Sequence, residues 1–399
     1  ALRFGSLGQQ SFWYDEAYTL DVFVSQPWSR IATDYSAPNN HVFYSLLLRP
    51  VYLVSDSEYL LRFPSLLFAA GTLAMVFRIA RRWAGLPAGL LATLFLGLTQ
   101  MFLIHAMQVR GYGLSMFLAA WLADMAVAER PGRWGRLGAI ALAGAAFLYV
   151  LPTNLLFFVP LAVVAAVWTA TYEGKPSGTL RELAAWGLAG LLAGLAYLPI
   201  ADQVRAMGAG RASATWLDVL RLAGDVFSAA TRDWLLVLPL AALGLIAWIQ
   251  QARRRPARTH LAMPLVTVAL LAGPLLLTGL LGVHPFVRNY CPVLPFLALA
   301  VGWLVAESIR AAGRYLPPLR SEYPAALLGL ALLAFIFIDL AFILLLYRKE
   351  FLPDVMIVKK RRRKWEDLYV REEDKEGKGI DTGGLAETLT RAVYPYYKK

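Results

Sequence analysis

The chain has 399 residues, of which 58% are hydrophobic and only 17% are charged. Its mean hydropathy is +0.52. Soluble globular proteins carry about 25% charged residues, so this composition excludes an ordinary soluble domain and indicates a membrane protein. A net charge of +12 would favour nucleic acid as the partner of a soluble protein. Here the basic residues cluster between apolar runs, as they do in membrane proteins, so no nucleic-acid partner is expected.

Apolar runs long enough to cross a bilayer recur along the chain and predict an all-α polytopic integral membrane protein. Proline and glycine within several runs are tolerable, because neighbouring helices can satisfy the backbone groups that they free. The predicted spans cover residues 62–80, 87–104, 111–128, 137–151, 154–170, 183–200, 233–250, 261–281, 292–309 and 324–347.

Arginine clusters lie between the spans, and the positive-inside rule places such clusters in the cytoplasm. This orientation puts residues 1–60, 201–232 and 282–291 on the extracytoplasmic face. Because the chain begins on that face without an apolar helix, we expect that a preceding transmembrane helix is missing from this numbering or has been processed away. The clusters consist of Arg78, Arg81 and Arg82; Arg130, Arg133 and Arg136; and Arg253, Arg254, Arg255 and Arg258.

Two outer segments are predicted to form helices at the membrane surface, beside a transmembrane bundle at 61–310. Residues 11–55, within the first outer loop at 1–60, are apolar but interrupted by acids, arginine and proline. This pattern cannot form a regular span and indicates short amphipathic helices. The second outer loop, 201–232, mixes arginine and aspartate with apolar residues and is predicted to form a juxtamembrane helix pair.

The C-terminal segment differs in composition from the rest. Residues 1–347 contain one lysine and 24 arginines, whereas residues 348–399 contain eight lysines and six arginines. Counting spans from an outside start leaves this tail outside, yet the run KKRRRK at 359–364 favours the cytoplasm. Either the span count is off by one, or a periplasmic tail happens to be basic, or roughly 320–399 is a foreign element. In the last case the helix at 324–347 and the charged tail are a fusion or a separate polypeptide, and they could bind membrane-protein partners.

The sequence FWYDEAYTL near the start of the chain carries two adjacent carboxylates, Asp15 and Glu16, among aromatic residues. On an outer loop of a membrane protein, such a pair can act as a base, as a metal ligand or only as a solvated charge. Further motifs decide between these uses, and they are SAPNNHVFYSLLLR at 36–49, LLRFPSLLFAA at 60–70, FRIARR at 77–82, HAMQVRGYGLSMFL at 105–118 and VRNYCPVLPFLALA at 287–300.

In this order the motifs resemble those of the GT-C membrane glycosyltransferases. The similarity is to the bacterial branch related to protein O-mannosyltransferases and lipid A aminoarabinose transferases, and it extends to about residue 310. Two departures stand out. Asn-Asn-His replaces the commoner His-Pro-Pro in the second motif, and Asn289 separates Arg288 from Tyr290. The resemblance implies a GT-C-type helical bundle and an inverting transferase of a hexose or pentose from a polyprenyl-phosphate donor.

The resemblance also implies roles for individual residues. Asp15 would be the catalytic carboxylate that removes the acceptor proton. Glu16 would be an accessory to it, although an acid there also suits the start of a helix as a cap. Arg62, Arg110 and Arg288 lie at the outer ends of predicted spans. There their guanidinium groups would bind the donor phosphate, or only snorkel to lipid headgroups.

Four further residues are predicted to line the pocket: Asn40, His41, Tyr112 and Tyr290. His41 would bind the donor phosphate or assist a metal, or it is an ordinary polar loop residue. His105 also falls at an outer helix end. Four scattered histidines do not form a metal site by their spacing. Some relatives use a divalent metal ion, but this sequence does not show one, so no cofactor is assigned.

Two other functions compete with the transferase hypothesis. A transporter would place charged residues at mid-membrane on broken, repeat-related helices, whereas here they lie at helix ends. A non-catalytic subunit of a larger membrane complex would explain the unusual tail and the departures from the family pattern. The leading hypothesis expects a multi-pass protein of the bacterial inner membrane, with its site facing the periplasm or cell exterior. Its partners would be the polyprenyl-phosphate sugar, membrane lipids and an acceptor that the sequence does not identify.

Overall fold

The computed structural model describes residues 12–127, 134–173, 176–209, 213–231, 237–254, 259–283 and 285–313. Throughout these ranges the regular structure is helical, and none of the described residues forms a strand. The chain divides into two units, 1–342 and 343–399, and every described residue belongs to the first. The predicted span at 324–347 and the charged tail lie outside the described residues.

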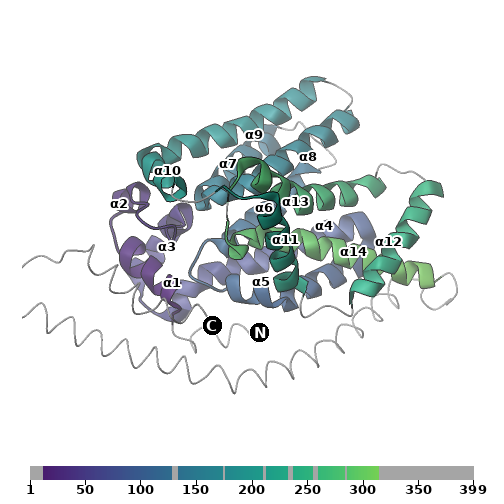
Figure 1. The fold of residues 1–399 in the computed structure, drawn as a ribbon, viewed down its shortest axis with the longest axis horizontal. Coiled ribbons are helices and arrows are strands. Elements are labelled where there is room, and N and C mark those ends of the chain that lie inside the picture. Colours follow the sequence, from purple (N-terminus) through teal and green to yellow (C-terminus); the bar gives the residue numbers. More distant parts are fainter. Residues whose placement is uncertain are drawn as a thin grey trace, which may run out of the picture. The chain divides into compact units, whose positions relative to one another are not determined.

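The first outer segment folds into four short helices, as its interrupted apolar pattern indicates. They are α1 (Tyr14–Tyr18), the π-helix η2 (Thr19–Val24), α2 (Trp28–Thr33) and α3 (Val42–Val54). The loop at 201–232 contains the two helices α10 (Ala201–Ala209) and α11 (Trp216–Thr231), which follow the short 3-10 helix η4 (Leu198–Ile200). In Figure 1 the purple helices α1 to α3 gather beside α10 at one end of the bundle.

The predicted spans at 62–80 and 87–104 form one helical hairpin, α4 (Glu58–Leu98). Its two arms meet at Gly85, whose φ of 82° lies in the left-handed region that glycine tolerates. A Cβ placed on Gly97 would lie 3.6 Å from the Leu73 side chain, so the second arm returns along the first. The short α5 (Gln100–His105) follows after a break at Thr99.

The remaining helices build the bundle. They are α6 (Tyr112–Ala126), α7 (Trp134–Val150), the 3-10 turn η3 (Pro152–Asn154), α8 (Leu155–Glu173), α9 (Pro176–Tyr197), α12 (Val237–Arg254), α13 (Thr259–Leu281), the 3-10 helix η6 (Val287–Val293) and α14 (Leu294–Ala312). By length and composition, five helical stretches of the described chain could cross a membrane, and α6, α7 and part of α12 are shorter apolar helices. The prediction of an all-α polytopic membrane protein is therefore confirmed.

Close helix contacts hold α14 in the bundle. This helix packs mainly on α4 and α12. A Cβ on Gly302 would fall 2.5 Å from the backbone nitrogen of Ala92, so only glycine allows the α14 and α4 backbones to approach this closely. Small residues serve this purpose in membrane helix packing. At its C-terminal end, the Arg310 guanidinium donates to the carbonyl of Ala84 beside the α4 turn.

Three segments predicted to share the outer face do meet at one end of the bundle. Gln203 of α10 accepts a hydrogen bond from the Tyr35 backbone at 2.6 Å. The backbone N–H of Ala214 donates to the carbonyl of Gly282 at 2.9 Å, and Asp15 pairs with Arg288. Predicted cytoplasmic arginines pair elsewhere in the fold: Arg78 and Arg82 with Asp124, and Arg136 with Glu182.

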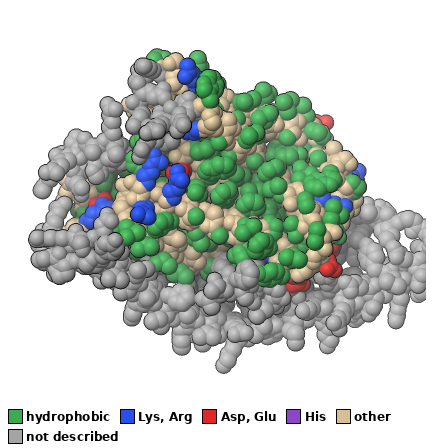
Figure 2. All heavy atoms as spheres, turned by 180° about the vertical axis from the view of Figure 1, so that it is seen from behind, with side chains coloured by type: hydrophobic (Ala, Val, Ile, Leu, Met, Phe, Trp, Pro, Cys, Tyr) green, Lys and Arg blue, Asp and Glu red, His purple; other side chains and the backbone are tan. Residues whose placement is uncertain are grey.

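Apolar side chains cover much of the bundle exterior. Figure 2 shows a broad, nearly continuous hydrophobic surface on one face of the molecule. Exposed leucine, isoleucine and valine side chains recur along the long helices, and they include Val159, Val163, Leu188, Leu191, Leu195, Ile246, Val268, Leu276 and Leu280. Contiguous apolar exposure of this kind is rare on soluble monomers and suits contact with lipid.

Candidate functional site

Asp15 lies where three remote segments meet. It is the second residue of α1, and its Oδ2 atom contacts Nη1 of Arg110 and, at 3.0 Å, Nη1 of Arg288. Arg110 lies in the turn between α5 and α6, and Arg288 lies in η6. The second carboxylate oxygen of Asp15, Oδ1, forms no hydrogen bond with any described residue. The Asp15 side chain is 26% exposed and that of Arg110 only 2%, so a buried cation is aimed at an accessible carboxylate.

Glu16 points away from the junction of Asp15, Arg110 and Arg288 and into the protein. Its Oε1 accepts hydrogen bonds from Nε of Arg62 at 3.1 Å and from the backbone N–H of Val109 at 2.8 Å. Its Oε2 accepts from Nη2 of Arg62 at 2.8 Å and from the backbone N–H of Trp13 at 2.9 Å. A carboxylate offers about four acceptor positions, and all four are used here. Glu16 thus caps the start of α1 and forms a buried ion pair.

The imidazole of His41 joins the turn after α5 to the first outer segment. Its Nδ1 accepts the backbone N–H of Gly111 at 2.8 Å, and its Nε2 lies 3.1 Å from Nη2 of Arg110. A neutral imidazole offers only one acceptor nitrogen, so one of these two donors is not satisfied by the ring. The Nε atom of Arg110 is also buried without a hydrogen-bond partner among the described residues. The junction therefore has spare hydrogen-bond donors.

Burial sets the charge of His41. Loss of hydration lowers the pKa of the ring well below 6.5, and the positive charges of Arg110 and Arg288 lower it further. His41 is therefore neutral at pH 7. For His105, burial likewise lowers the pKa, to about 4, although its hydrogen bond with Gln108 opposes the shift. Both rings contact Tyr112 edge-on, with centroids 4.8 and 5.2 Å away.

The other predicted pocket residues divide into two groups. Tyr112 belongs to the junction, since the Arg110 guanidinium lies 5.2 Å from the centre of its ring. Asn40 instead donates to the carbonyls of Ile31 and Asp34 and closes the loop before α3. Tyr290 is buried and contacts the Thr278 hydroxyl of α13, so the structure places it in the helix packing rather than beside Asp15.

Two contributors to the junction were not among the predicted site residues. Asn39 places its Oδ1 atom 3.5 Å from Nη2 of Arg110. His105 packs on Tyr112 and lies close enough for Asp15, Arg110 and Arg288 to influence its pKa. The position of His105 at a helix end was the only signal for it in the sequence. Nothing in the spacing of Asn39 could have revealed its contact, because Arg110 follows 71 residues later.

A metal-binding cluster is not evident in the part of the chain that the structure describes. There, no group of three or more His, Cys, Asp or Glu side chains is arranged to hold a metal ion. The two histidines of the junction are surrounded by arginines, and Glu16 is fully engaged by its four donors.

Comparison with solved structures assigns the fold. Two crystal structures of ArnT from Cupriavidus metallidurans, one in the apo state and one bound to undecaprenyl phosphate, match with TM-scores of 0.52 and sequence identities of 16%. The matches cover 78% and 83% of this chain, and 59% and 61% of those chains. The chain has the GT-C-type fold. It spans only about three fifths of the length of these two structures.

Sequence comparisons add a finding at the C-terminus. The family described as "Family of unknown function (DUF7318)" matches residues 316–399. This range begins just after the last described helix and contains the tail whose composition differs from the rest. No curated protein matches the chain.

Replacing Glu16 by glutamine should strongly destabilise the protein. The change removes the closest counter-charge of the buried Arg62 guanidinium and leaves the Glu58 carboxylate 4.0 Å away, and removing one partner of a buried ion pair typically costs about 3–5 kcal/mol. Thermal unfolding of the purified protein in detergent measures the loss. The matched control is Asp202→Asn, which removes an exposed pair with Arg205 worth at most about 1 kcal/mol. Equal unfolding midpoints for the two variants would contradict a structural role for Glu16.

Acidification should destabilise the protein partly through His41. The native state keeps this ring neutral, whereas the unfolded chain binds a proton below about pH 6.5. Stability is therefore fully present above that pH and falls as the pH drops, by up to about 1.4 kcal/mol per pH unit for one such group. His41→Asn, which keeps an acceptor for Gly111, should show a shallower fall when thermal midpoints are measured across this pH range. Identical pH profiles would rule out the neutral buried ring.

Proposed function

We propose that this protein is an inverting glycosyltransferase that moves a monosaccharide from a polyprenyl-phosphate donor to an acceptor. The observation that supports this function most directly is the junction, where Arg110 and Arg288, from two remote segments, contact one oxygen of Asp15. The GT-C-type fold supports the proposal, and so does the likeness to an ArnT structure bound to undecaprenyl phosphate.

The two arginines would bind the phosphate of the donor. Guanidinium groups stay charged and match the geometry of phosphate oxygens. With Asp15 between them, the three side chains carry a net charge of +1, which favours an incoming anion. The spare donors of Arg110 and the unsatisfied donor beside His41 would gain acceptors when a phosphate binds. Arg62 would not take part, because Glu16 already holds it in a bidentate pair.

Asp15 would be the general base. When the donor phosphate binds Arg110 and Arg288, these arginines no longer need to pair with Asp15. The Asp15 carboxylate can then accept a proton from the acceptor. The acceptor oxygen or nitrogen then bonds to the anomeric carbon as the bond from that carbon to the phosphate oxygen breaks. The proton passes to Asp15, and the phosphate leaves with both electrons of the broken bond, stabilised by Arg110 and Arg288. One displacement of this kind inverts the configuration at the anomeric carbon.

Glu16 and Arg62 would position this machinery without touching the reacting atoms. Their pair fixes α1 against α4 and the turn before Arg110. The motif resemblance includes both protein O-mannosyltransferases and aminoarabinose transferases, so hexose and pentose donors both fit the proposal. We place the junction on the periplasmic or exterior face of a bacterial inner membrane, opposite the arginine clusters.

Asp15→Asn should abolish most of the transfer while leaving the donor lipid bound. Loss of a general base typically lowers the rate about 10²- to 10⁴-fold, and the amide removes no phosphate ligand. Transfer is measured in membranes supplied with polyprenyl-phosphate sugars, beside Asp202→Asn as an exposed control. Full transfer by a normally expressed Asp15→Asn protein would contradict the assignment of Asp15 as the general base.

Arg288→Gln should weaken the binding of undecaprenyl phosphate. A hydrogen bond to a charged group contributes about 1.5–3 kcal/mol, so the Kd should rise about 10- to 100-fold. Titration of the purified protein with the lipid measures this change. Arg205→Gln is the matched control, because the Arg205 side chain is 79% exposed and its ion pair with a described residue is the exposed one with Asp202. An unchanged Kd in Arg288→Gln would remove the support for a phosphate site.

We also propose that residues 316–399 are a foreign element, either fused to the transferase or a separate polypeptide. The family match begins at 316, and the lysine-rich composition begins soon after. This unit is a candidate for contacts with membrane-protein partners. Peptide mapping distinguishes a fusion from a separate polypeptide: a proteolytic peptide continuous through 310–330 is expected for a fusion, and its absence despite coverage on both sides would indicate two chains.

A further inference from the structure

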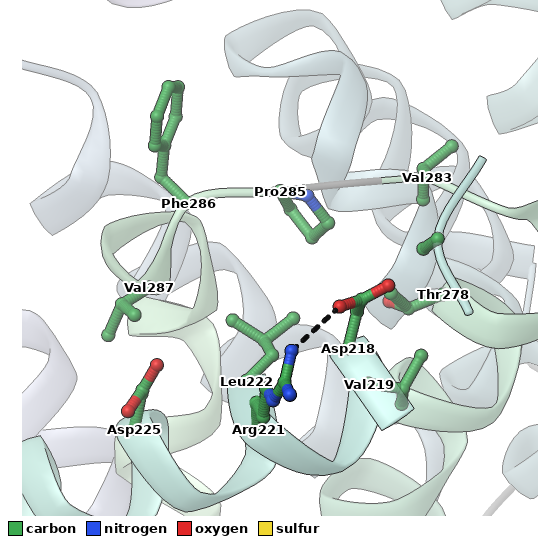
Figure 3. Close-up of a pocket in the computed structure, with 11 residues that line it drawn as sticks. Asp218, Val219, Arg221, Leu222, Asp225, Thr278, Val283, Pro285, Phe286 and Val287 are labelled. Carbon is green, nitrogen blue, oxygen red and sulfur yellow. Dashed lines mark ion pairs between the residues drawn. The ribbon is translucent and has the colours of Figure 1, made fainter. Parts of the chain in front are cut away.

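An open pocket of about 320 Å³ lies between α11 and the segment that leads from α13 into η6 (Figure 3). One wall is α11, and the other is formed by residues between the end of α13 and η6. Its lining ends at Val287, which directly precedes Arg288. Helix α11 also packs against η6 and against α5, the helix that ends at His105. The pocket is therefore lined in part by η6, the element that carries Arg288.

Defined backbone contacts build this pocket. Helix α13 ends with Gly282 at a φ of 60°, and the N–H of Val283 donates to the carbonyl of Thr278 at 3.2 Å. This pattern is a glycine-terminated helix cap. The N–H of Ala214 then donates to the Gly282 carbonyl, which ties the start of the α11 segment to the cap. The Trp216 ring packs so closely on Gly279 that a Cβ there would lie 2.3 Å from it.

The charged side chains of the pocket come from one face of α11. Asp218, Arg221 and Asp225 are spaced three and four residues apart, so they share a helix face. Asp218 accepts from the Thr215 backbone and hydroxyl at 3.0 and 2.6 Å and lies 3.6 Å from Nη1 of Arg221. Figure 3 shows Arg221 extended toward Asp218. Among the described residues, none forms a hydrogen bond or ion pair with the Asp225 carboxylate.

This charge pattern differs from that of the junction. Two carboxylates and one guanidinium line the pocket, a net charge of −1, which disfavours a second anion. A free carboxylate suits a ligand that donates hydrogen bonds from hydroxyl or amine groups. Val283, Pro285 and Val287 add apolar surface, which suits the faces of a sugar ring. The volume is near the lower end of the 300–1,000 Å³ range of small-molecule pockets, enough for a headgroup.

We propose that this pocket binds the acceptor, and that it recognises a neutral or amine-bearing sugar headgroup through Asp225. This inference rests on the proposed function, since it needs the donor phosphate at Arg110 and Arg288. It assigns the donor phosphate to the arginines of the junction and the acceptor headgroup to the pocket on α11, and η6 contributes Arg288 to the first and Val287 to the second.

Binding of simple glycosides to the full chain in lipid nanodiscs tests the proposal. The probes are methyl glucoside and methyl glucosaminide, followed by saturation-transfer NMR with undecaprenyl phosphate present. We expect both variants Asp225→Asn and Leu222→Trp to bind the preferred glycoside at least tenfold more weakly than the parent. Asp202→Asn, on an exposed part of α10, should bind it like the parent. All proteins should bind undecaprenyl phosphate within about twofold of one another, which also reports correct folding.

Several outcomes would overturn the proposal. One is that the parent binds neither glycoside, and another is that both pocket variants bind as the parent does. A loss of undecaprenyl phosphate binding in Asp225→Asn and Leu222→Trp would assign the pocket to the donor lipid instead. A different result, unchanged binding of undecaprenyl phosphate by Arg288→Gln, would contradict the proposed function. Failure of the acceptor-pocket proposal can therefore be distinguished from failure of the transferase proposal.

Discussion

The buried ion pair between Glu16 and Arg62 holds three remote segments together. Its carboxylate takes hydrogen bonds from α4, from the turn before Arg110 and from the start of α1. Burying two charges is costly, and only bonds as complete as these offset the lost hydration. Because α1 is fixed in this way, the adjacent side chain of Asp15 is held at one angle toward the arginines. Site geometry therefore depends on a residue that does not face the site.

Charge then distinguishes the junction of Asp15, Arg110 and Arg288 from the pocket on α11. Burial keeps His41 neutral, so it adds hydrogen-bonding capacity to the junction without adding charge. The junction keeps an excess of arginine, whereas the pocket on α11 has an excess of carboxylate. A phosphate and an uncharged or amine-bearing headgroup would therefore sort to different places before any bond is broken, which favours productive orientation.

The sequence predicted the helical bundle and placed Asp15, Arg110 and Arg288 on the same face of the membrane, because the arginines lie at the outer ends of apolar runs and Asp15 lies in an outer loop, but it did not show that the three side chains meet. It could not show that Glu16 turns inward, since successive helix positions point in different directions and the partner lies 46 residues away. Tyr290 illustrates the same limit, because the tight η6 turn sends it toward α13 while Arg288 faces Asp15. The pocket depends on contacts between α11 and the end of α13, which no local pattern encodes.

Helix α14 is held in place at both of its ends. It follows directly from η6, which carries Arg288, and its far end is fastened to the α4 turn by Arg310. The backbone contact at Gly302 and Ala92 prevents it from sliding along α4 without a clash. The chain continues beyond Ala312 into the segment that resembles a different family. The contacts of α14 with α4 therefore also fix the position from which η6 presents Arg288 to Asp15.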